Sequence, residues 1–567
     1  MDSLMNPHTA MMDGKTIMPL LRGAALLNDP IWNRGAAFTH QERAALGLTG
    51  LLPCTVETIA DQATRVLEQL GEYETPDEQS IFLMELLNTN ETLFYYVLLH
   101  HPGELLPIVY TPGISAMIKR YSHRFRRPRG LYITYDDIDR IDEVLSHRPH
   151  DHLDVVVVTD SSGILGIGDQ GVGGIGITTG KLLLDVMCGA ARPERTLGIA
   201  LDVGTDSQTL LDDPLYMGWR NHRLDDATYF EFIERFVDAL HAACPGVLLH
   251  WEDIATPHAQ QVLERTHRRV CSYNDDIHGT GVVVLGTILS AMAATGSQLA
   301  DQRIVIYGAG CAGIGSADII SQQVEADGGF NGDGGIWAID IGGLLHEASD
   351  FNQMQAKYVR STDEVASWVR NDEGAILLDE VVRRVKPTVL IGASSDGGAF
   401  TKEIIQEMAA HVTRPIVLPL SNPTAKSEAI PQDVHEWTQG RAIVATGSPF
   451  GSIPSSAGPI RVAQCNNVFS FPGVTLAKNA VGATEVTESM LLAAASALAS
   501  CSPMLDDPGA PPLPPVENAR GVAHLLSHAI ATVALEEGVA THHPTESITL
   551  QQMIDATQWT PAYAPLV

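Results

Sequence analysis

The chain has 567 residues, of which 45% are hydrophobic and 18% are charged. This length exceeds one ordinary core and predicts about three or four packing units. The formal net charge of −32 repels polyanions, which argues against nucleic acid or an anionic membrane as a partner. An anionic substrate therefore requires a local cluster of positive charge or a metal ion.

The first 30 residues lack both the apolar core of a signal peptide and the Arg/Ser-rich composition of a transit peptide. The cytoplasm is the expected location. We find no run of about 20 apolar residues and expect no membrane-spanning segment. The seven cysteines are scattered and never spaced Cys-x-x-Cys, which favours reduced thiols over a disulfide framework or a zinc site.

Residues 1–128 are predicted to form a helical N-terminal domain, because apolar residues recur there at three- and four-residue spacing. From about residue 129, short apolar runs alternate with helical patterns, which predicts a parallel sheet. A second α/β series begins at Arg303 and predicts a separate doubly wound domain. The limits are those implied by the family resemblance given below: an α/β substrate and metal domain over 129–275, completed by 465–538, a Rossmann-type NAD-binding domain over 276–464, and a C-terminal tail over 539–567.

The pattern G-x-G-x-x-G occurs at 166–171, 171–176 and 308–313. Only the third copy follows an apolar strand and opens a helix, as a dinucleotide loop requires. The predicted cofactor contacts in this loop are Gly308, Ala309, Gly310, Ala312 and Gly313.

Asp340 ends the next predicted strand of this series. A carboxylate there accepts hydrogen bonds from the ribose hydroxyls and repels a 2′-phosphate, so NAD is favoured over NADP. The copy at 166–171 follows a Ser-Ser-Gly turn and is interpreted as a hairpin. The glycines at 173–176 are interpreted as a flexible approach to a helix that begins near Ile177 and carries Lys181.

Acidic residues end two neighbouring strands of the first α/β series: Glu252 and Asp253 after one, Asp275 and Asp276 after the next. Because the carboxyl ends of parallel strands share one edge of the sheet, these acids are expected to converge. Oxygen-only ligands suit Mg²⁺ or Mn²⁺. The spacing alone leaves open that the acids only cap two helices.

Two further side chains are ambiguous on their own pattern. Lys181 lies among apolar residues, so it is either a snorkelling surface residue or, if buried beside a cation, a usable base. Tyr110 follows an apolar, strand-like run, and taken alone it is expected to be a core residue.

Many spaced motifs resemble those of the malic enzyme family, from about residue 15 to the C-terminus. They include VYTPG, FRRPRGLYIT, GILGIGDQG, GKLLL, HWED, SYNDDIHGTG, GAGCAG, PLSNPT and QCNNVFSFPG. The resemblance implies oxidative decarboxylation of L-malate to pyruvate and CO₂, with NAD⁺ and Mg²⁺ or Mn²⁺. It also implies a homodimer or homotetramer.

The resemblance assigns roles to individual residues. It implies Glu252, Asp253 and Asp276 as metal ligands, with Asp276 also near the cofactor. Lys181 resembles the family's general base, Tyr110 its general acid, and Asp275 the neighbour that supports the base. The implied substrate and nicotinamide contacts are Asn422, Asn466 and Asn467.

The sequence departs from the family pattern at Gly163, where malic enzymes carry an arginine that holds a substrate carboxylate. Malolactic enzymes, which convert malate to lactate with NAD⁺ kept bound, carry glycine there. A malolactic enzyme, or a catalytically silent NAD- or metabolite-sensing relative, is therefore an alternative. We hypothesise that Arg126, Arg127 or Arg129 compensates, since an unreplaced charge-assisted contact would cost roughly 1.5 to 3 kcal/mol.

Overall fold

The computed structural model describes residues 10–12, 17–164, 166–455, 458–564 and 566. The chain divides into two compact units. The first unit comprises residues 1–161, 170–249 and 555–567, and the second comprises residues 162–169 and 250–554. The chain therefore crosses from one unit to the other at four points.

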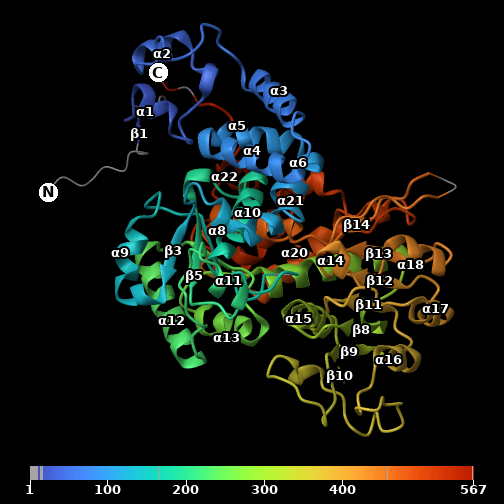
Figure 1. Ribbon diagram of the computed structural model, residues 1–567. Helices are drawn as coiled ribbons and strands as arrows, with labels where there is room; N and C mark the ends of the chain where they lie inside the picture. Colours follow the sequence, from blue (N-terminus) through green and yellow to red (C-terminus); the bar gives the residue numbers. More distant parts are fainter. Residues whose placement is uncertain (1–9, 13–16, 165, 456–457, 565, 567) are drawn as a thin grey trace. The chain divides into compact units, whose positions relative to one another are not determined.

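The N-terminal part of the first unit is mainly helical, as predicted (Figure 1). A short antiparallel pair, β1 (Ala10–Met12) and β2 (Ile17–Pro19), comes first. Capping boxes start α2, α3 and α4, where a threonine and the acid three residues later bind each other's backbone N–H. The helices are α1 (Gly23–Leu27), α2 (His40–Ala45), α3 (Ile59–Leu70), α4 (Pro76–Thr89), α5 (Glu91–His100), α6 (Pro102–Val109), α7 (Gly113–Lys119) and α8 (Tyr121–Arg124).

A five-stranded sheet follows, with strand order β3-β5-β4-β6-β7 and parallel β3/β5 and β4/β5 pairs. This sheet confirms the one predicted from the short apolar runs after residue 129. The boundary between the units falls within β6. The elements are β3 (Leu131–Thr134), α9 (Ile141–Ser146), β4 (Val155–Thr159), α10 (Ile175–Met187), β5 (Thr196–Asp202), α11 (Gln208–Asp212), α12 (Asp226–Ala243), β6 (Leu248–Trp251), α13 (Thr256–Thr266) and β7 (Ser272–Asn274).

The second unit contains a seven-stranded sheet of order β10-β9-β8-β11-β12-β13-β14, parallel except for β9/β10. Its first strand, β8, lies between β9 and β11, which makes a topological switch point beside β8. Helices α16, α17 and α18 cover one face (Figure 1). The elements are β8 (Arg303–Tyr307), α15 (Cys311–Ala326), β9 (Gly335–Asp340), β10 (Gly343–Leu344), α16 (Leu378–Val385), β11 (Val389–Gly392), α17 (Lys402–His411), β12 (Ile416–Pro419), α18 (Pro431–Trp437), β13 (Ile443–Thr446) and β14 (Ala463–Gln464).

Helix α14 (Thr280–Thr295), preceded by the π-helical turn η5 (Asp275–Gly279), packs against α15 and α20. Together they form one apolar helical stretch, Asp275–Thr295, long enough to cross a membrane, with mean hydropathy 1.7. In the sequence we did not find an apolar run of this length, but length and composition alone do not overturn the expectation that no segment spans a membrane. Because 72% of its most apolar window is buried inside the protein, we interpret it as a core helix.

Helices α19 (Phe471–Val481), α20 (Glu488–Ser500) and α21 (Ala519–Glu536) pack together in the second unit, and α22 (Leu550–Thr557) leads into the C-terminal segment. None of the seven cysteines, all of which lie in the described part of the chain, is joined in a disulfide.

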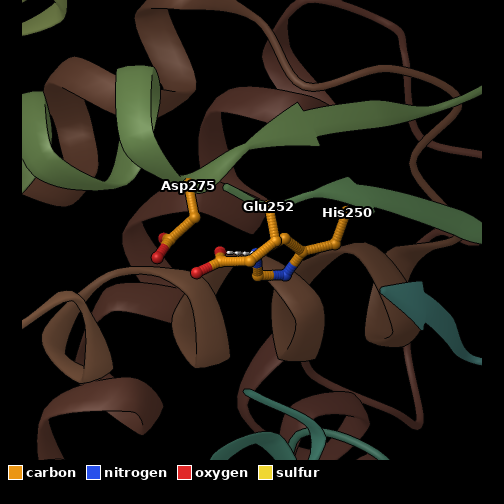
Figure 2. Close-up of side chains that lie close together, drawn as sticks. All are labelled: His250, Glu252 and Asp275. Atoms are coloured by element: carbon orange, nitrogen blue, oxygen red, sulfur yellow. Dashed lines mark ion pairs between the residues drawn. The ribbon is translucent and has the colours of Figure 1, made fainter. Parts of the chain in front are cut away.

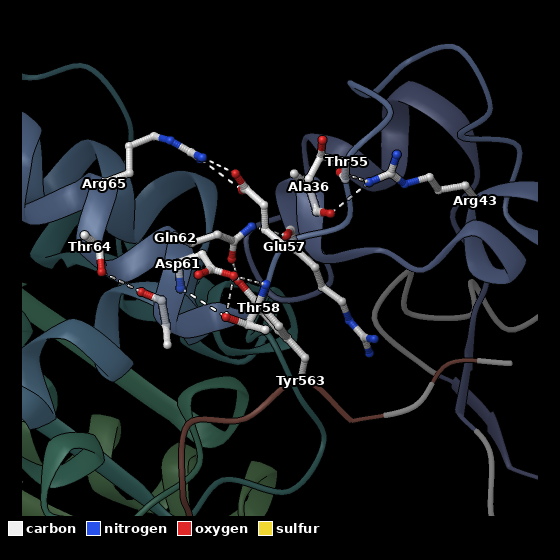
Figure 3. A network of polar contacts seen from close by, with 12 residues as sticks. Ala36, Arg43, Thr55, Glu57, Thr58, Asp61, Gln62, Thr64, Arg65 and Tyr563 are labelled. Atoms are coloured by element: carbon white, nitrogen blue, oxygen red, sulfur yellow. Dashed lines mark hydrogen bonds and ion pairs between the residues drawn. The ribbon is translucent and has the colours of Figure 1, made fainter.

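The C-terminal segment packs within the first unit. The Tyr563 hydroxyl donates to Gln62 Oε1 and accepts from Asn90 Nδ2, each at 2.8 Å. Figure 3 shows Tyr563 beside the start of α3, where Thr58 and Asp61 form the capping box. Leu566 is fully buried in an apolar cluster whose other buried members are Leu26, Phe38, Leu46 and Leu48. The two ends of the chain therefore share one core.

Truncating Leu566 to alanine is expected to destabilise the first unit by about 2–5 kcal/mol, because it leaves a cavity in this cluster. Urea unfolding followed by circular dichroism measures the loss. Leu215→Ala is the matched control, because Leu215 is 56% exposed and belongs to the same unit. Equal effects of both variants would show that the cluster does not stabilise the unit.

Candidate active site

Three buried carboxylates lie together in the second unit: Glu252, Asp253 and Asp276. One oxygen from each lies within 4.8 Å of the others, and the side chains belong to residues only 2%, 2% and 4% exposed. Three like charges so close and so buried are costly unless a cation compensates them. The all-oxygen donor set fits Mg²⁺ or Mn²⁺.

The acids do not act as side-chain caps of the helices they precede. Asn274 caps η5, because its side chain accepts from the Ile277 N–H at 3.0 Å, and α13 has no side-chain cap. Asp253 has a φ of 53°, in the left-handed region, and its N–H donates to Asp276 Oδ2 at 2.8 Å. This bond ties the two strand ends together.

A second group shares Glu252 with the first and adds His250 and Asp275 (Figure 2). The distance between His250 Nε2 and Glu252 Oε2 is 3.4 Å, and His250 is fully buried. The strand pattern around His250 gave no signal for this role, since a histidine in a buried strand is usually a core residue. Two overlapping donor sets therefore compete for Glu252.

Asp275 is held by residues from a distant part of the chain. Asn467 Nδ2 donates to Asp275 Oδ2 at 2.9 Å, and the Tyr273 hydroxyl donates to Oδ1 at 3.3 Å. Asn466 Oδ1 accepts from the Val468 N–H at 3.0 Å and caps the short helix η9 (Asn467–Phe469). Asn467 thus positions Asp275, whereas its predicted contact with substrate stays a prediction.

Burial lowers the pKa of His278 to about 4, so this ring is neutral near pH 7. Its Nδ1 accepts a hydrogen bond from the Asn274 N–H at 3.4 Å, as the unprotonated nitrogen of a neutral imidazole can. His278 therefore adds no charge beside the carboxylates.

The predicted cofactor loop joins β8 to α15 at the switch point. Gly308 has a φ of 106°, and a Cβ there would lie 2.3 Å from the Ala393 carbonyl oxygen. A Cβ on Gly313 would lie 1.9 Å from the Gly308 carbonyl oxygen. At Gly310, by contrast, the nearest atom among the described residues would be Thr256 Oγ1, at 3.3 Å. The loop thus turns tightly and leaves its middle glycine open for the approach of a pyrophosphate.

The acid predicted to bind ribose is held at the end of β9. Asp340 Oδ2 accepts from Gln355 Nε2 at 2.5 Å, and the same nitrogen donates to the Ala309 carbonyl oxygen at 3.0 Å. Gln355 thereby links the cofactor loop to the acid. Sequence reasoning missed Gln355, because it begins a short 3₁₀ helix (η7, Gln355–Tyr358) that has no motif of its own. Asn422, after β12, accepts from Ser448 Oγ at 2.5 Å through its Oδ1.

The remaining two candidates, Tyr110 and Lys181, lie together in the first unit. Lys181 on α10 is 3% exposed, Tyr110 is 8% exposed, and the Lys181 Nζ lies 5.9 Å from the centroid of the tyrosine ring. The run before Tyr110 is helix α6 and not the expected strand. Helix α10 begins at Ile175, after a 3₁₀ turn at Gly171–Gly174 (η3), earlier than the predicted start near Ile177.

Two of the three arginines proposed to compensate for Gly163 contact the helical part of the first unit. Arg129 pairs with Glu91 at 2.6 Å, and Arg127 donates to the Asn88 carbonyl oxygen at 2.9 Å. The positive charge of Arg129 is thus already balanced by a buried carboxylate.

A dinucleotide loop at the switch point of a doubly wound sheet, in one unit with a three-carboxylate cluster, defines a dinucleotide-dependent oxidoreductase with a divalent-metal site. Residues 87–267 match the family model described as malic enzyme, N-terminal domain, and residues 277–535 match malic enzyme, NAD binding domain. The chain belongs to the malic enzyme family.

Curated relatives include the NAD-dependent malic enzyme of Escherichia coli K12, 42% identical over 545 residues, covering 95% of this chain and 96% of the relative. The enzyme of the same name from Erwinia tasmaniensis is 42% identical over 544 residues, with the same coverage. The crystal structure of Entamoeba histolytica malic enzyme matches with a TM-score of 0.55 at 22% identity, covering 91% of this chain and 90% of that chain. Pyrococcus horikoshii malic enzyme matches with a TM-score of 0.53 at 24% identity, covering 80% and 87%. The structural matches confirm the predicted fold class.

Proposed function

We propose that the chain catalyses the NAD-dependent oxidative decarboxylation of L-malate. Malate loses the hydrogen on C2 to NAD⁺ as hydride and its C4 carboxylate as CO₂, leaving pyruvate and NADH. The observation that carries the proposal is the placement of the carboxylate cluster beside the dinucleotide loop. Thr256, three residues after Asp253, accepts at 3.4 Å from the N–H of Cys311, which begins α15. Near-full-length identity to NAD-dependent malic enzymes supports it.

The chain's own residues account for binding and proton transfer. Glu252, Asp253 and Asp276 would hold a divalent cation, which when bound acidifies the C2 hydroxyl of malate and stabilises the charge left by CO₂. Lys181, which is buried on α10 at 3% exposure, is proposed to take the proton from that hydroxyl as the general base. Tyr110 delivers a proton to C3 after decarboxylation.

The product distinguishes this function from the malolactic alternative. Protein mixed with malate, NAD⁺ and Mn²⁺ is expected to produce NADH, measured at 340 nm, in equal amounts with pyruvate. Lactate without NADH would establish the malolactic reaction. No turnover at any malate concentration would favour a sensing role.

Asp340 is proposed to set the preference for NAD. Asp340→Ser is expected to lower kcat/KM for NAD⁺ on the order of ten- to a hundredfold, the value of a charge-assisted hydrogen bond. The loss for NADP⁺ should be smaller, because the repulsive carboxylate is gone. Steady-state kinetics with both cofactors measure the ratio. Asp350→Ser, at an exposed acid in the loop after β10, is the control. An unchanged ratio would remove Asp340 from cofactor selection.

We further propose that the protein is cytoplasmic and that it forms a homodimer or a homotetramer. Size-exclusion chromatography with light scattering decides the second.

A further inference from the structure

The hairpin at residues 162–169 belongs to the second unit, although the strand that precedes it, β4, belongs to the first. Within the described part of this hairpin, the N–H of Gly168 donates to the Ile164 carbonyl oxygen at 2.7 Å. In this hairpin Gly163 replaces the family arginine. The hairpin contains none of the proposed metal ligands and no part of the cofactor loop, so its role is still to be explained.

One end of the hairpin binds the backbone of the loop that carries Asp253. The Gly163 N–H donates to the Asp253 carbonyl oxygen at 3.0 Å. Ser162 Oγ accepts from the N–H of Ala255 at 2.8 Å. A Cβ on Gly163 would approach the N and Cα of Ala255 to 3.0 Å, tighter than side chains normally tolerate. The contact therefore requires a glycine, or a shift of the loop.

The other end of the hairpin approaches Asn422. Gly166 has a φ of 80°, and a Cβ there would lie 2.3 Å from the Asn422 carbonyl oxygen and 2.7 Å from Pro423 Cδ. Two glycines three residues apart thus allow one short segment to contact two separate loops of the second unit.

Asp253 is the ligand for which such support matters most. Its left-handed backbone, at φ 53°, costs free energy for a residue with a side chain. The surrounding structure must hold it there: the Asp253 N–H donates to Asp276, and its carbonyl oxygen accepts from the hairpin. The hairpin contacts come from residues outside the carboxylate donor set, so they could support Asp253 independently of metal binding.

We propose that Ser162 and Gly163 are positioning residues that hold Asp253 in its metal-binding conformation. This inference rests on the proposed function only in taking Asp253 as a metal ligand. Gly163 then has a structural role of its own. Its backbone N–H binds the Asp253 carbonyl oxygen, and its lack of a side chain allows the close approach to Ala255. Residues that orient ligands typically contribute 10–100-fold to metal affinity.

The test measures Mn²⁺ binding to the full chain without malate or NAD⁺, through the electron paramagnetic resonance signal of free Mn²⁺. Ser162→Ala is expected to raise the Mn²⁺ Kd at least about tenfold. Ser162→Thr, which keeps the hydroxyl, should restore it to within about threefold. Ser349→Ala removes an equivalent bond, from the His346 N–H at 2.9 Å, in the loop after β10, and should leave Kd unchanged.

Gly163→Ala provides an independent variant that leaves Ser162 intact. It is expected to raise the Mn²⁺ Kd about as much as Ser162→Ala does. The Tm of the metal-free Gly163→Ala chain should change by no more than the Tm of Ser349→Ala. Unchanged Mn²⁺ affinity in both Ser162→Ala and Gly163→Ala would overturn the proposal. A wild-type chain that binds Mn²⁺ but does not oxidise malate would refute the proposed function and leave the positioning role standing.

Discussion

Replacing Lys181 by methionine is expected to lower kcat for malate oxidation about 10²- to 10⁴-fold, the usual contribution of a positioned general base. Methionine matches the length and apolar character of the lysine stem, and Lys181 is only 3% exposed, so the helix should keep its packing. The measurement is the rate of NADH formation at saturating malate, NAD⁺ and Mn²⁺.

The matched control is Lys478→Met, because Lys478 is also buried, at 4% exposure, on helix α19. Its Nζ donates to the neighbouring Asn479 Oδ1 at 3.2 Å, and no role in the reaction is assigned to it. Mn²⁺ affinity should be unchanged in Lys181→Met. Full activity of that variant would exclude Lys181 as the base.

The second large effect is expected at the metal site, where two donor sets share Glu252. Asp253→Asn should raise the Mn²⁺ Kd by more than about 100-fold, beyond the range for residues that only support ligands. His250→Gln should raise it by no more than about tenfold, because a hard cation prefers the oxygen-only set. Mn²⁺ titration followed by paramagnetic resonance measures both.

If His250→Gln raises the Mn²⁺ Kd more than Asp253→Asn does, the cation would be assigned to His250, Glu252 and Asp275 instead. Both substitutions preserve approximate side-chain size, so folding is checked by thermal unfolding of the metal-free chain. Activity at saturating Mn²⁺ provides the second readout, since Asp253→Asn should remain slow even when the site is filled.

The sequence predicted best those parts of the site whose geometry depends on a few neighbouring residues. The strand before Gly308, the glycines themselves and the helix after them identified the cofactor loop, because tight turning and backbone approach depend on local geometry. The acids at the ends of β6 and β7 were expected to converge, because parallel strands share a carboxyl edge, and they do. The alternative that they only cap helices failed, since Asn274 supplies the cap.

What the sequence missed depends on contacts between distant segments. Gln355 donates to both Ala309 and Asp340 from a short 3₁₀ helix whose sequence carries no motif. The apolar run before Tyr110 has the composition of a strand, but the residues from Pro102 onward form a helix, which begins with a proline as helices often do. The helix after Asp276 is longer and more continuous than its sequence pattern indicates, because a π-helical turn that carries two acids precedes the apolar run and extends it.

The shared core of the two chain ends has a consequence for how the protein is made. Tyr563 bonds to Gln62, 501 residues earlier, and Leu566 completes a cluster that includes Leu26. During synthesis the N-terminal helices emerge long before Tyr563 and Leu566, so this cluster can form only after most of the chain has been made. Contacts of such high sequence separation close slowly and leave apolar surface exposed meanwhile. Substitutions that remove the contacts of Tyr563 or Leu566 are therefore expected to leave apolar surface of this cluster open, and to favour aggregation.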